Sequence, residues 1–303
     1  MNETETLTMT EVVETENNTY AKKRSLWLDA FDNLKRDKLA LASLLIVIFY
    51  SLVALLSALG IIAADWNAEV GPSYAPPYAE YWLGTDIFGR DVLTKVIHGT
   101  QVAMSVGLVS SLIAIPIGVA LGALAGYFGG WIDEIVVWFY TTFSSIPNIM
   151  LLMSIAFILG KGITSVYIAL GITSWVGLCR LIRGEVMKHK NREYVQAADA
   201  IGGGHMRKLF KHILPNVSHI VIINTSLQFQ VAIKSEVILS YLGIGVTGQP
   251  SWGTMIDDAK LELARGVWWQ LGGATIAMFF VVLAFNILGD ALRDALDPKL
   301  KGK

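Results

Sequence analysis

The chain has 303 residues, of which 53% are hydrophobic and only 16% are charged. Soluble domains average about 25% charged residues, so this composition predicts an integral membrane protein. The net charge of −1 excludes a protein that binds nucleic acid mainly through its charge, and the single cysteine, Cys179, excludes a disulfide scaffold.

The first 38 residues are predicted to form a tail that precedes the membrane-spanning part. Residues 1–20 contain five Glu and no Lys or Arg, which is a composition typical of disordered segments. The first apolar run starts late and lacks a small-residue cleavage site, so we do not expect a secretory signal peptide.

Apolar stretches dominate the rest of the chain. About 20 apolar residues suffice for a helix to cross the hydrocarbon core of a bilayer. Six stretches qualify and predict an all-α fold with six transmembrane helices. They cover residues 39–64, 102–127, 135–159, 163–183, 217–242 and 268–291.

The distribution of Lys and Arg predicts the orientation of these spans. Basic residues gather in the tail 1–38, in the loop 184–216 and in the C-terminal tail 292–303. The connections on the opposite side carry few of them. Because cytoplasmic segments are enriched in Lys and Arg, both termini and the loop 184–216 are expected on the cytoplasmic side.

Residues 65–101 are therefore expected to form an external loop. Gly71-Pro72 and Pro76-Pro77 mark turns within it. The spacing of Val92, Val96 and Ile97 predicts a short amphipathic helix at the membrane surface, just before the second span.

Glycines and prolines inside the spans indicate how the helices pack. Gly118, Gly122 and Gly126 recur every four residues in the second span, a small-residue face that suits close helix packing. Pro116 and Pro147 are predicted to kink the second and third spans.

The loop 184–216 predicts a protruding helix–turn–helix. Residues 194–201 favour a helix, and Gly202 with the two glycines after it ends that helix. A second helix is expected at 205–213, with one apolar face, and Pro215 is expected to end it. The face comprises Met206, Leu209, Phe210 and Ile213. We interpret the unit as a docking element rather than a solvated connector.

The fifth span differs from the others because polar residues surround most of its circumference. Gln228, Lys234 and Glu236 are the candidates for function. A charge facing lipid is costly, so this span is expected to be buried in protein or to line a water-filled path. Two interpretations of the charges stay open: an interhelical ion-pair brace, or a pathway or gate.

Several chemistries lack a sequence signal. No phosphate-binding loop of the type G-x-x-x-x-G-K-[ST] occurs, so the chain is not expected to hydrolyse ATP. No paired cysteine or H-E-x-x-H pattern predicts a metal site, and no nucleophile–base pair predicts a catalytic residue. Active transport would need energy from a partner through the cytoplasmic loop, or from an ion gradient.

The cytoplasmic loop resembles the EAA loop of import-type ABC permeases. Gln196-Ala197-Ala198 is followed after three residues by Gly202, and after nine more by His212, Ile213, Leu214 and Pro215. Gln196 replaces the usual Glu, and His212 stands at a usually apolar position. The His-x-Leu-Pro-Asn ending is similar to the dipeptide/oligopeptide/nickel subfamily. Further segments resemble the C-type permease of that subfamily, at 24–44, 82–93, 239–246, 251–256 and 283–298.

This resemblance implies the type I ABC importer permease fold, with residues 102–291 as the permease core. It implies an inner-membrane complex with a second homologous permease, two ATPases that bind ATP and Mg²⁺, and an extracytoplasmic solute-binding protein. No cofactor is expected on this chain. The residues expected to couple to the ATPases are Glu193, Tyr194, Gln196, Ala197, Ala198, Asp199, Gly202, His212, Leu214 and Pro215.

The resemblance favours di- and oligopeptides as substrates. Nickel or another small solute is the alternative within the same type of complex. A self-sufficient secondary transporter that uses Lys234 and Glu236 is the alternative of a different class.

Overall fold

The computed structural model describes residues 37–296. The predicted disorder of residues 1–20 and most of the two predicted tails lie outside the described residues. The described chain forms helices, with two isolated β-bridges near residues 69–91. In chain order these are α3 (Lys38–Ala58), α4 (Val92–Phe128), α5 (Gly130–Ser145), α6 (Asn148–Leu159), α7 (Ile163–Thr173), α8 (Trp175–Lys190), α9 (Glu193–Ala200), α10 (His205–Arg207), the π-turn η1 (Lys208–Ile213), α11 (Leu214–Tyr241), α12 (Trp252–Leu263) and α13 (Trp269–Leu296).

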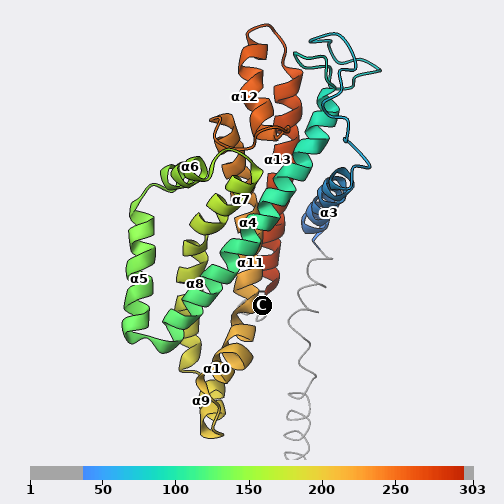
Figure 1. The fold of residues 1–303 in the computed structure, drawn as a ribbon. Helices are drawn as coiled ribbons and strands as arrows, with labels where there is room; N and C mark the ends of the chain where they lie inside the picture. Colours follow the sequence, from blue (N-terminus) through green and yellow to red (C-terminus); the bar gives the residue numbers. More distant parts are fainter. Residues whose placement is uncertain (1–36, 297–303) are drawn as a thin grey trace, which may run out of the picture.

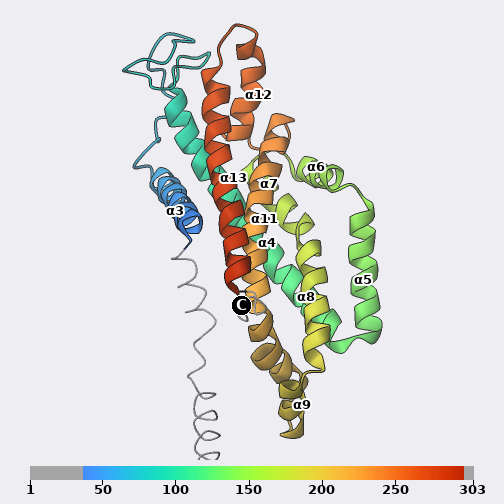
Figure 2. The same ribbon diagram turned by 180° about the vertical axis from the view of Figure 1, so that it is seen from behind.

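The long helices α4, α11 and α13 form the centre of an elongated bundle (Figure 1). Helix α3 contacts α4 and α13 on one side, and α7 and α8 contact α4 on the other. Helices α5 and α6 lie at the outer edge (Figure 2). The α12 end of the bundle carries α12 and the segment 59–91, whereas the α9 end carries α9 and α10.

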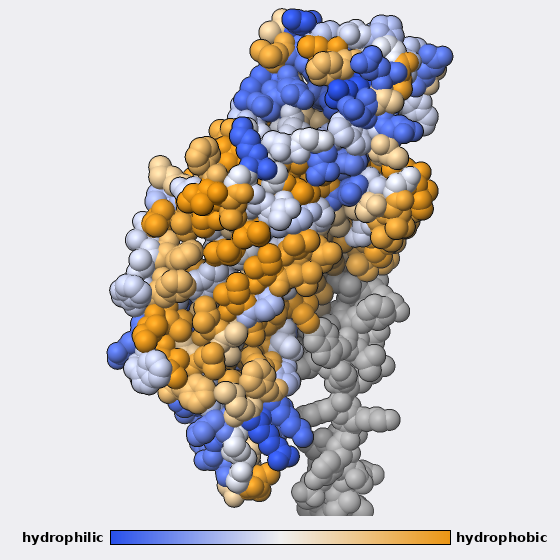
Figure 3. Space-filling view, in the orientation of Figure 1, coloured by the Kyte–Doolittle hydropathy of each residue, from blue (hydrophilic) through white to orange (hydrophobic). Residues whose placement is uncertain are grey.

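An apolar band separates the two polar ends of the bundle (Figure 3). Among the described residues, four helical segments are long and apolar enough to span a membrane: Lys38–Ala58, Val92–Phe128, Ile163–Lys190 and Trp269–Ala295. The pair α5 and α6 makes a fifth if its two bent parts count as one span. The predicted span 217–242 corresponds to α11, whose polar residues keep it outside this set. By length and composition, the described residues therefore contain four or five candidate spans rather than the predicted six.

Pro147 bends the third predicted span sharply. Helix α5 ends at Ser145, Ile146 is extended, and α6 starts after Pro147. The proline ring disfavours helical backbone at the preceding residue. The two helices consequently meet at 90°, so the kink expected at this proline is a right-angled break.

Two predicted boundaries on the N-terminal half are wrong. The first span, predicted to reach residue 64, ends at Ala58. The separate surface helix predicted around Val92 and Val96 does not exist, because those residues begin α4, which runs unbroken to Phe128. The side chain of Asp91 caps this helix by accepting a hydrogen bond from the Thr94 N–H at 2.8 Å. Both valines are buried in the protein core rather than set on a membrane surface.

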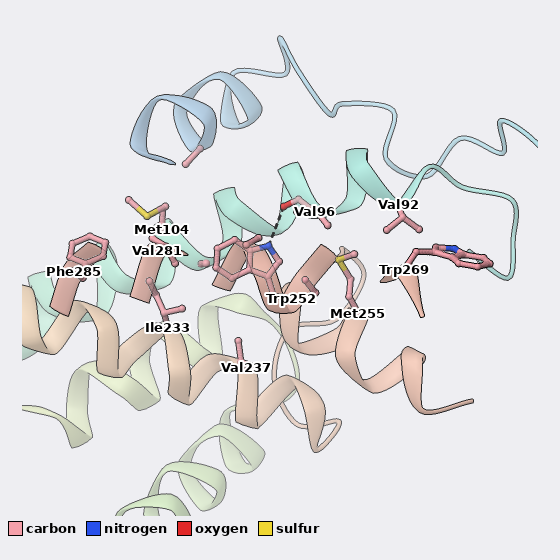
Figure 4. Close-up of a cluster of buried hydrophobic side chains, with 14 of the residues drawn as sticks. Val92, Val96, Met104, Ile233, Val237, Trp252, Met255, Trp269, Val281 and Phe285 are labelled. Carbon is pink, nitrogen blue, oxygen red and sulfur yellow. Dashed lines mark hydrogen bonds between the residues drawn. The ribbon is translucent and has the colours of Figure 1, made fainter. Parts of the chain in front are cut away.

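That core joins α4, α11, α12 and α13 around the indole of Trp252 (Figure 4). The Trp252 side chain is fully buried, and its Nε1–H donates to the Val96 carbonyl at 3.1 Å. Burial of an indole costs little free energy when its single N–H donor makes a hydrogen bond. The short helix α12 is thereby fixed to the start of α4.

The predicted glycine face of α4 lies against α8. A Cβ atom added at Gly118, Gly122 or Gly126 would come within 2.9 Å, 2.5 Å or 2.6 Å of a backbone oxygen of α8. Only glycine permits such an approach of two helix backbones. The two helices make the most extensive helix–helix contact of the described chain.

Candidate functional site

The α9 end is built from a short helix, a glycine turn and a second helix. Helix α9 ends at Ala200, and Gly202 follows with φ +79. The N–H of Gly203 donates to the carbonyl of Ala198 at 2.9 Å and closes the helix end. Positive φ is readily adopted by glycine alone, so Gly202 sets the direction in which the chain leaves α9.

The chain does not stop at Pro215, which is a correction to the predicted end of the second helix. The backbone passes from α10 through η1 into α11, with Pro215 in the first turn of α11. In η1 the N–H of Leu214 donates to Leu209, five residues back. A π-turn shifts the hydrogen-bond register and so accommodates a residue that has no N–H to donate. The element therefore continues into α11 without a break in the helical backbone.

The apolar face predicted for this second helix is divided between two environments. Leu209 and Ile213 are fully buried against the ends of α4 and α8. Met206 and Phe210 instead point outward with 55% and 62% of their surface exposed, and Ile201 at the turn is 86% exposed. We call Ile201, Met206 and Phe210 the tip patch. Exposed large apolar side chains on a protruding element are typical of a contact surface for another protein.

Polar contacts tie the element to the helices above it. The hydroxyl of Tyr127 on α4 lies 3.0 Å from Nδ1 of His205, and the hydroxyl of Tyr194 lies 2.7 Å from Nδ1 of His189. Lys208 donates to Asp199, and this hydrogen bond holds the pKa of the Asp199 carboxyl below its usual value. Helix α9 is thus linked both to the bundle and to the π-turn.

The predicted coupling residues occupy different environments on this element. Ala198 is buried, and Tyr194, His212 and Leu214 are half-buried. The remaining six are exposed: Glu193, Gln196, Ala197, Asp199, Gly202 and Pro215. Sequence reasoning did not single out Ile201, the most exposed apolar residue of the turn, because a single apolar residue beside glycines gives no periodic signal.

The three polar candidates of α11 do not form one site. Lys234 is exposed on the surface of this chain, whereas Glu236 is fully buried. The hydroxyl of Ser240, one turn further along, donates to Oε1 of Glu236 at 2.7 Å. Lys234 and Glu236 make no ion pair with each other or with another described residue. The interhelical brace proposed for them is absent within residues 37–296.

Gln228 lines two neighbouring hollows beside α11. One, of about 180 Å³, lies among α4, α8 and α11. The other, of about 380 Å³, extends toward α5 and α6. Nε2 of Gln228 is buried and has no hydrogen-bond partner in the described part of the chain. Ser174, Gly177 and Val231 line both hollows with it.

Comparison with known families places these features in context. The protein family described as "Binding-protein-dependent transport system inner membrane component" matches residues 118–302, more than half of the chain. The chain belongs to this family of transport permeases. The segment 25–81 matches the N-terminal transmembrane domain of oligopeptide transport permease C.

Named relatives of the permease span nearly its whole length. It is 36% identical to the dipeptide transport system permease protein of Bacillus subtilis over 90% of this chain and 86% of the relative. It is 34% identical to the oligopeptide transport system permease protein of the same organism, over 92% of each. A glutathione transport system permease protein of Pectobacterium atrosepticum is 33% identical over 92% of this chain and 93% of the relative. The permease is therefore a multi-pass membrane component of a binding-protein-dependent transport system.

The α12 end of the permease holds a buried polar network that sequence reasoning missed. Nζ of Lys95 on α4 donates to Asp86 at 2.8 Å and to Gln270 of α13 at 2.6 Å. All three side chains are at least 94% buried. One local signal was present: Lys95 shares a helix face with the buried Val92, Val96 and Gly99. A charge on such a face requires a buried partner.

Proposed function

We propose that the permease carries di- and oligopeptides across the inner membrane as one subunit of an ATP-driven importer. Three relatives at 33–36% identity are named for dipeptides, oligopeptides and glutathione, all of which are peptides. Peptide transport is therefore the substrate class that the comparisons favour over nickel or another small solute.

We propose a complex of this permease with a second, homologous permease, two ATPases and an extracytoplasmic solute-binding protein. ATP and Mg²⁺ would bind to the ATPases. Two features of α11 support a second permease: Lys234 is exposed on this chain, and Gln228 faces hollows that open to its surface. A charged or hydrogen-bonding side chain toward lipid is costly, so a protein partner or a water-filled path between the permeases should cover this face.

In this proposal the α9 end is cytoplasmic and docks into an ATPase. The tip patch carries the proposal, because its three apolar side chains are exposed while their neighbours Leu209 and Ile213 fix the element to the bundle. Closure of the ATPases would push on a unit that continues directly into α11. Because α10, η1 and α11 follow one another without a break, such a displacement would reach the helix that carries Gln228.

The concentration of Lys and Arg around 184–216 supports the cytoplasmic orientation of the α9 end. The α12 end would then face the outside and receive the binding protein. A self-sufficient carrier that uses Lys234 and Glu236 gains no support, since one side chain is exposed and the other is buried beside Ser240.

The test uses the complete complex in proteoliposomes, with uptake of a labelled dipeptide as the readout. The double variant Ile201→Ser with Phe210→Ser should lose the ATPases during purification and should lose ATP-driven uptake. Leu261→Ser is the matched control for ATPase binding, because Leu261 is 78% exposed at the opposite end. Unchanged ATPase binding and uptake in the double variant would refute docking at the tip patch. Uptake of nickel but not of peptide would refute the substrate class.

A further inference from the structure

We propose that Glu262, near the end of α12, is a proton-binding site, and that its protonated form holds α12 in place on the bundle. The inference concerns the α12 end and does not depend on what the permease transports. Under the orientation proposed above, the site would respond to the pH outside the cell.

The first observation is the environment of the Glu262 carboxyl group. The residue is 2% exposed, and both carboxylate oxygens are buried without a hydrogen-bond partner among residues 37–296. An ionised carboxylate in such a position loses its hydration and gains no hydrogen bond in return. The neutral acid avoids most of that cost.

The second observation is the balance of charge around the site. Three charged groups act electrostatically on Glu262: Lys95 of α4, Asp86 of the segment before α4, and the exposed Asp258 of α12. Lys95 is the single cation among them, and its ammonium already donates to Asp86 and Gln270. Arg90 acts on Asp258 rather than on Glu262. The carboxyl groups of Asp86 and Asp258 therefore oppose the effect of this one ammonium on Glu262, and a proton on Glu262 reduces the excess of negative charge.

Burial accordingly raises the pKa of Glu262 to about 7, with Lys95 lowering it and Asp258 and Asp86 raising it further. A group with this value changes its charge within the physiological range of pH.

The site lies where four parts of the fold meet, so its charge bears on how α12 is held. Besides binding Lys95, Gln270 of α13 donates to the Met255 carbonyl of α12 at 3.4 Å. Protonated Glu262 leaves the Lys95 ammonium to Asp86 and Gln270. Ionised Glu262 competes with Asp86 for the same ammonium and favours the movement of α12 toward water.

The sign of the pH effect follows from the direction of the pKa shift. The folded form binds the proton more tightly than the unfolded form does. The stabilising contribution is complete below the ordinary value of 4.5 and is lost as the pH rises through about 7. Above that range the contribution no longer changes.

The experiment measures the thermal unfolding midpoint of the purified complex between about pH 5 and about pH 9. The wild-type midpoint should fall by several degrees as the pH rises through this range, and Glu262→Gln should remove most of the fall. Asp257→Asn is the matched control on α12, since Asp257 is partly exposed and pairs with Lys260 at the surface, and it should retain the wild-type profile. Parallel profiles for wild type and Glu262→Gln would overturn the proposal.

A second measurement remains decisive if Glu262→Gln fails to fold. The infrared C=O stretching band of a protonated carboxylic acid should be present in wild type and Asp257→Asn at about pH 5 and should disappear with a midpoint near 7. Absence of such a titrating band in a folded wild-type protein would overturn the proposal. Its loss in a folded Glu262→Gln variant would assign the band to this residue.

Discussion

The carbonyl oxygen of Cys179 on α8 occupies the space that a side chain at Gly122 of α4 would need. A Cβ atom at Gly122 would lie 2.5 Å from that oxygen, well inside van der Waals contact. The same relationship recurs one turn later between Gly126 and Arg183, at 2.6 Å. The helix that leads into the α9 end is thus set directly on the backbone of α4.

Replacing Gly122 should force these two helices apart. We expect Gly122→Val to destabilise the permease by about 1–3 kcal/mol, the usual cost of overpacking. The atom that the new side chain would meet belongs to the backbone of α8 and cannot rotate away. Thermal unfolding in detergent measures the effect. Gly184→Ala is the control, since Gly184 lies in the facing helix α8 and has open space around its Cβ position. A Gly122→Val variant with a wild-type unfolding midpoint would contradict this packing.

The glycine turn of the α9 end should be sensitive at one position and tolerant at another. A Cβ at Gly203 would meet the Ala198 carbonyl at 2.5 Å, whereas Gly204 has ordinary negative φ and open space. Gly203→Val should reorient α9 and lower peptide uptake per ATP hydrolysed, and Gly204→Val should change it little. Coupled uptake and ATPase assays on the reconstituted complex measure the ratio. Equal effects of the two variants would show that the shape of the turn does not matter.

The buried Lys95–Asp86 pair should matter far more than an exposed pair of similar length. Lys95→Met leaves Asp86 buried without its cation, which costs about 3–5 kcal/mol in comparable buried pairs. Lys260→Met breaks the exposed pair of Lys260 with Asp257 and should change stability little. The nitrogen–oxygen distances of the two pairs are similar, at 2.8 Å for Lys95–Asp86 and 2.6 Å for Lys260–Asp257. Chemical or thermal unfolding of both variants makes the comparison. Similar losses in the two would contradict the assigned role of burial.

Gln228 should be reachable from water in the assembled complex. Cys179 is the single cysteine and is fully buried, so the wild-type chain should react little with a thiol reagent. A membrane-impermeant thiol reagent should label Gln228→Cys, and labelling should change with ATP. Ile276→Cys is the control on an exposed apolar face of α13 and should stay unlabelled in the bilayer. Protection of Gln228→Cys in every nucleotide state would exclude it from the pathway.

Local signals in the sequence were sufficient for several features of the site. Gly202 marked the turn after α9, and the four-residue spacing of Gly118, Gly122 and Gly126 matched the face set on α8. Pro147 marked the break between α5 and α6. Each of these depends on the chain within a few residues, where glycine and proline act through their own backbone preferences.

Other features depended on contacts that the sequence does not display. Lys95 binds Gln270, which is 175 residues away, so the sequence around either residue does not predict the contact. The apolar face predicted for 205–213 was split because the ends of α4 and α8 bury only Leu209 and Ile213. The helix continues past Pro215 because the π-turn before it shifts the hydrogen-bond register, so that no N–H is needed at that position. In the first two cases tertiary packing decided the outcome, whereas at Pro215 a local shift of the backbone hydrogen-bond register did.

If this chain is one permease in an ATP-driven complex, the mass of the intact complex shows it most directly. After gentle extraction from the native membrane, native mass spectrometry should find this chain once, with one different permease and two P-loop ATPases. That composition would support the proposed importer and leave the substrate to the binding protein. A stable homo-oligomer that transports peptide without any ATPase would contradict the account.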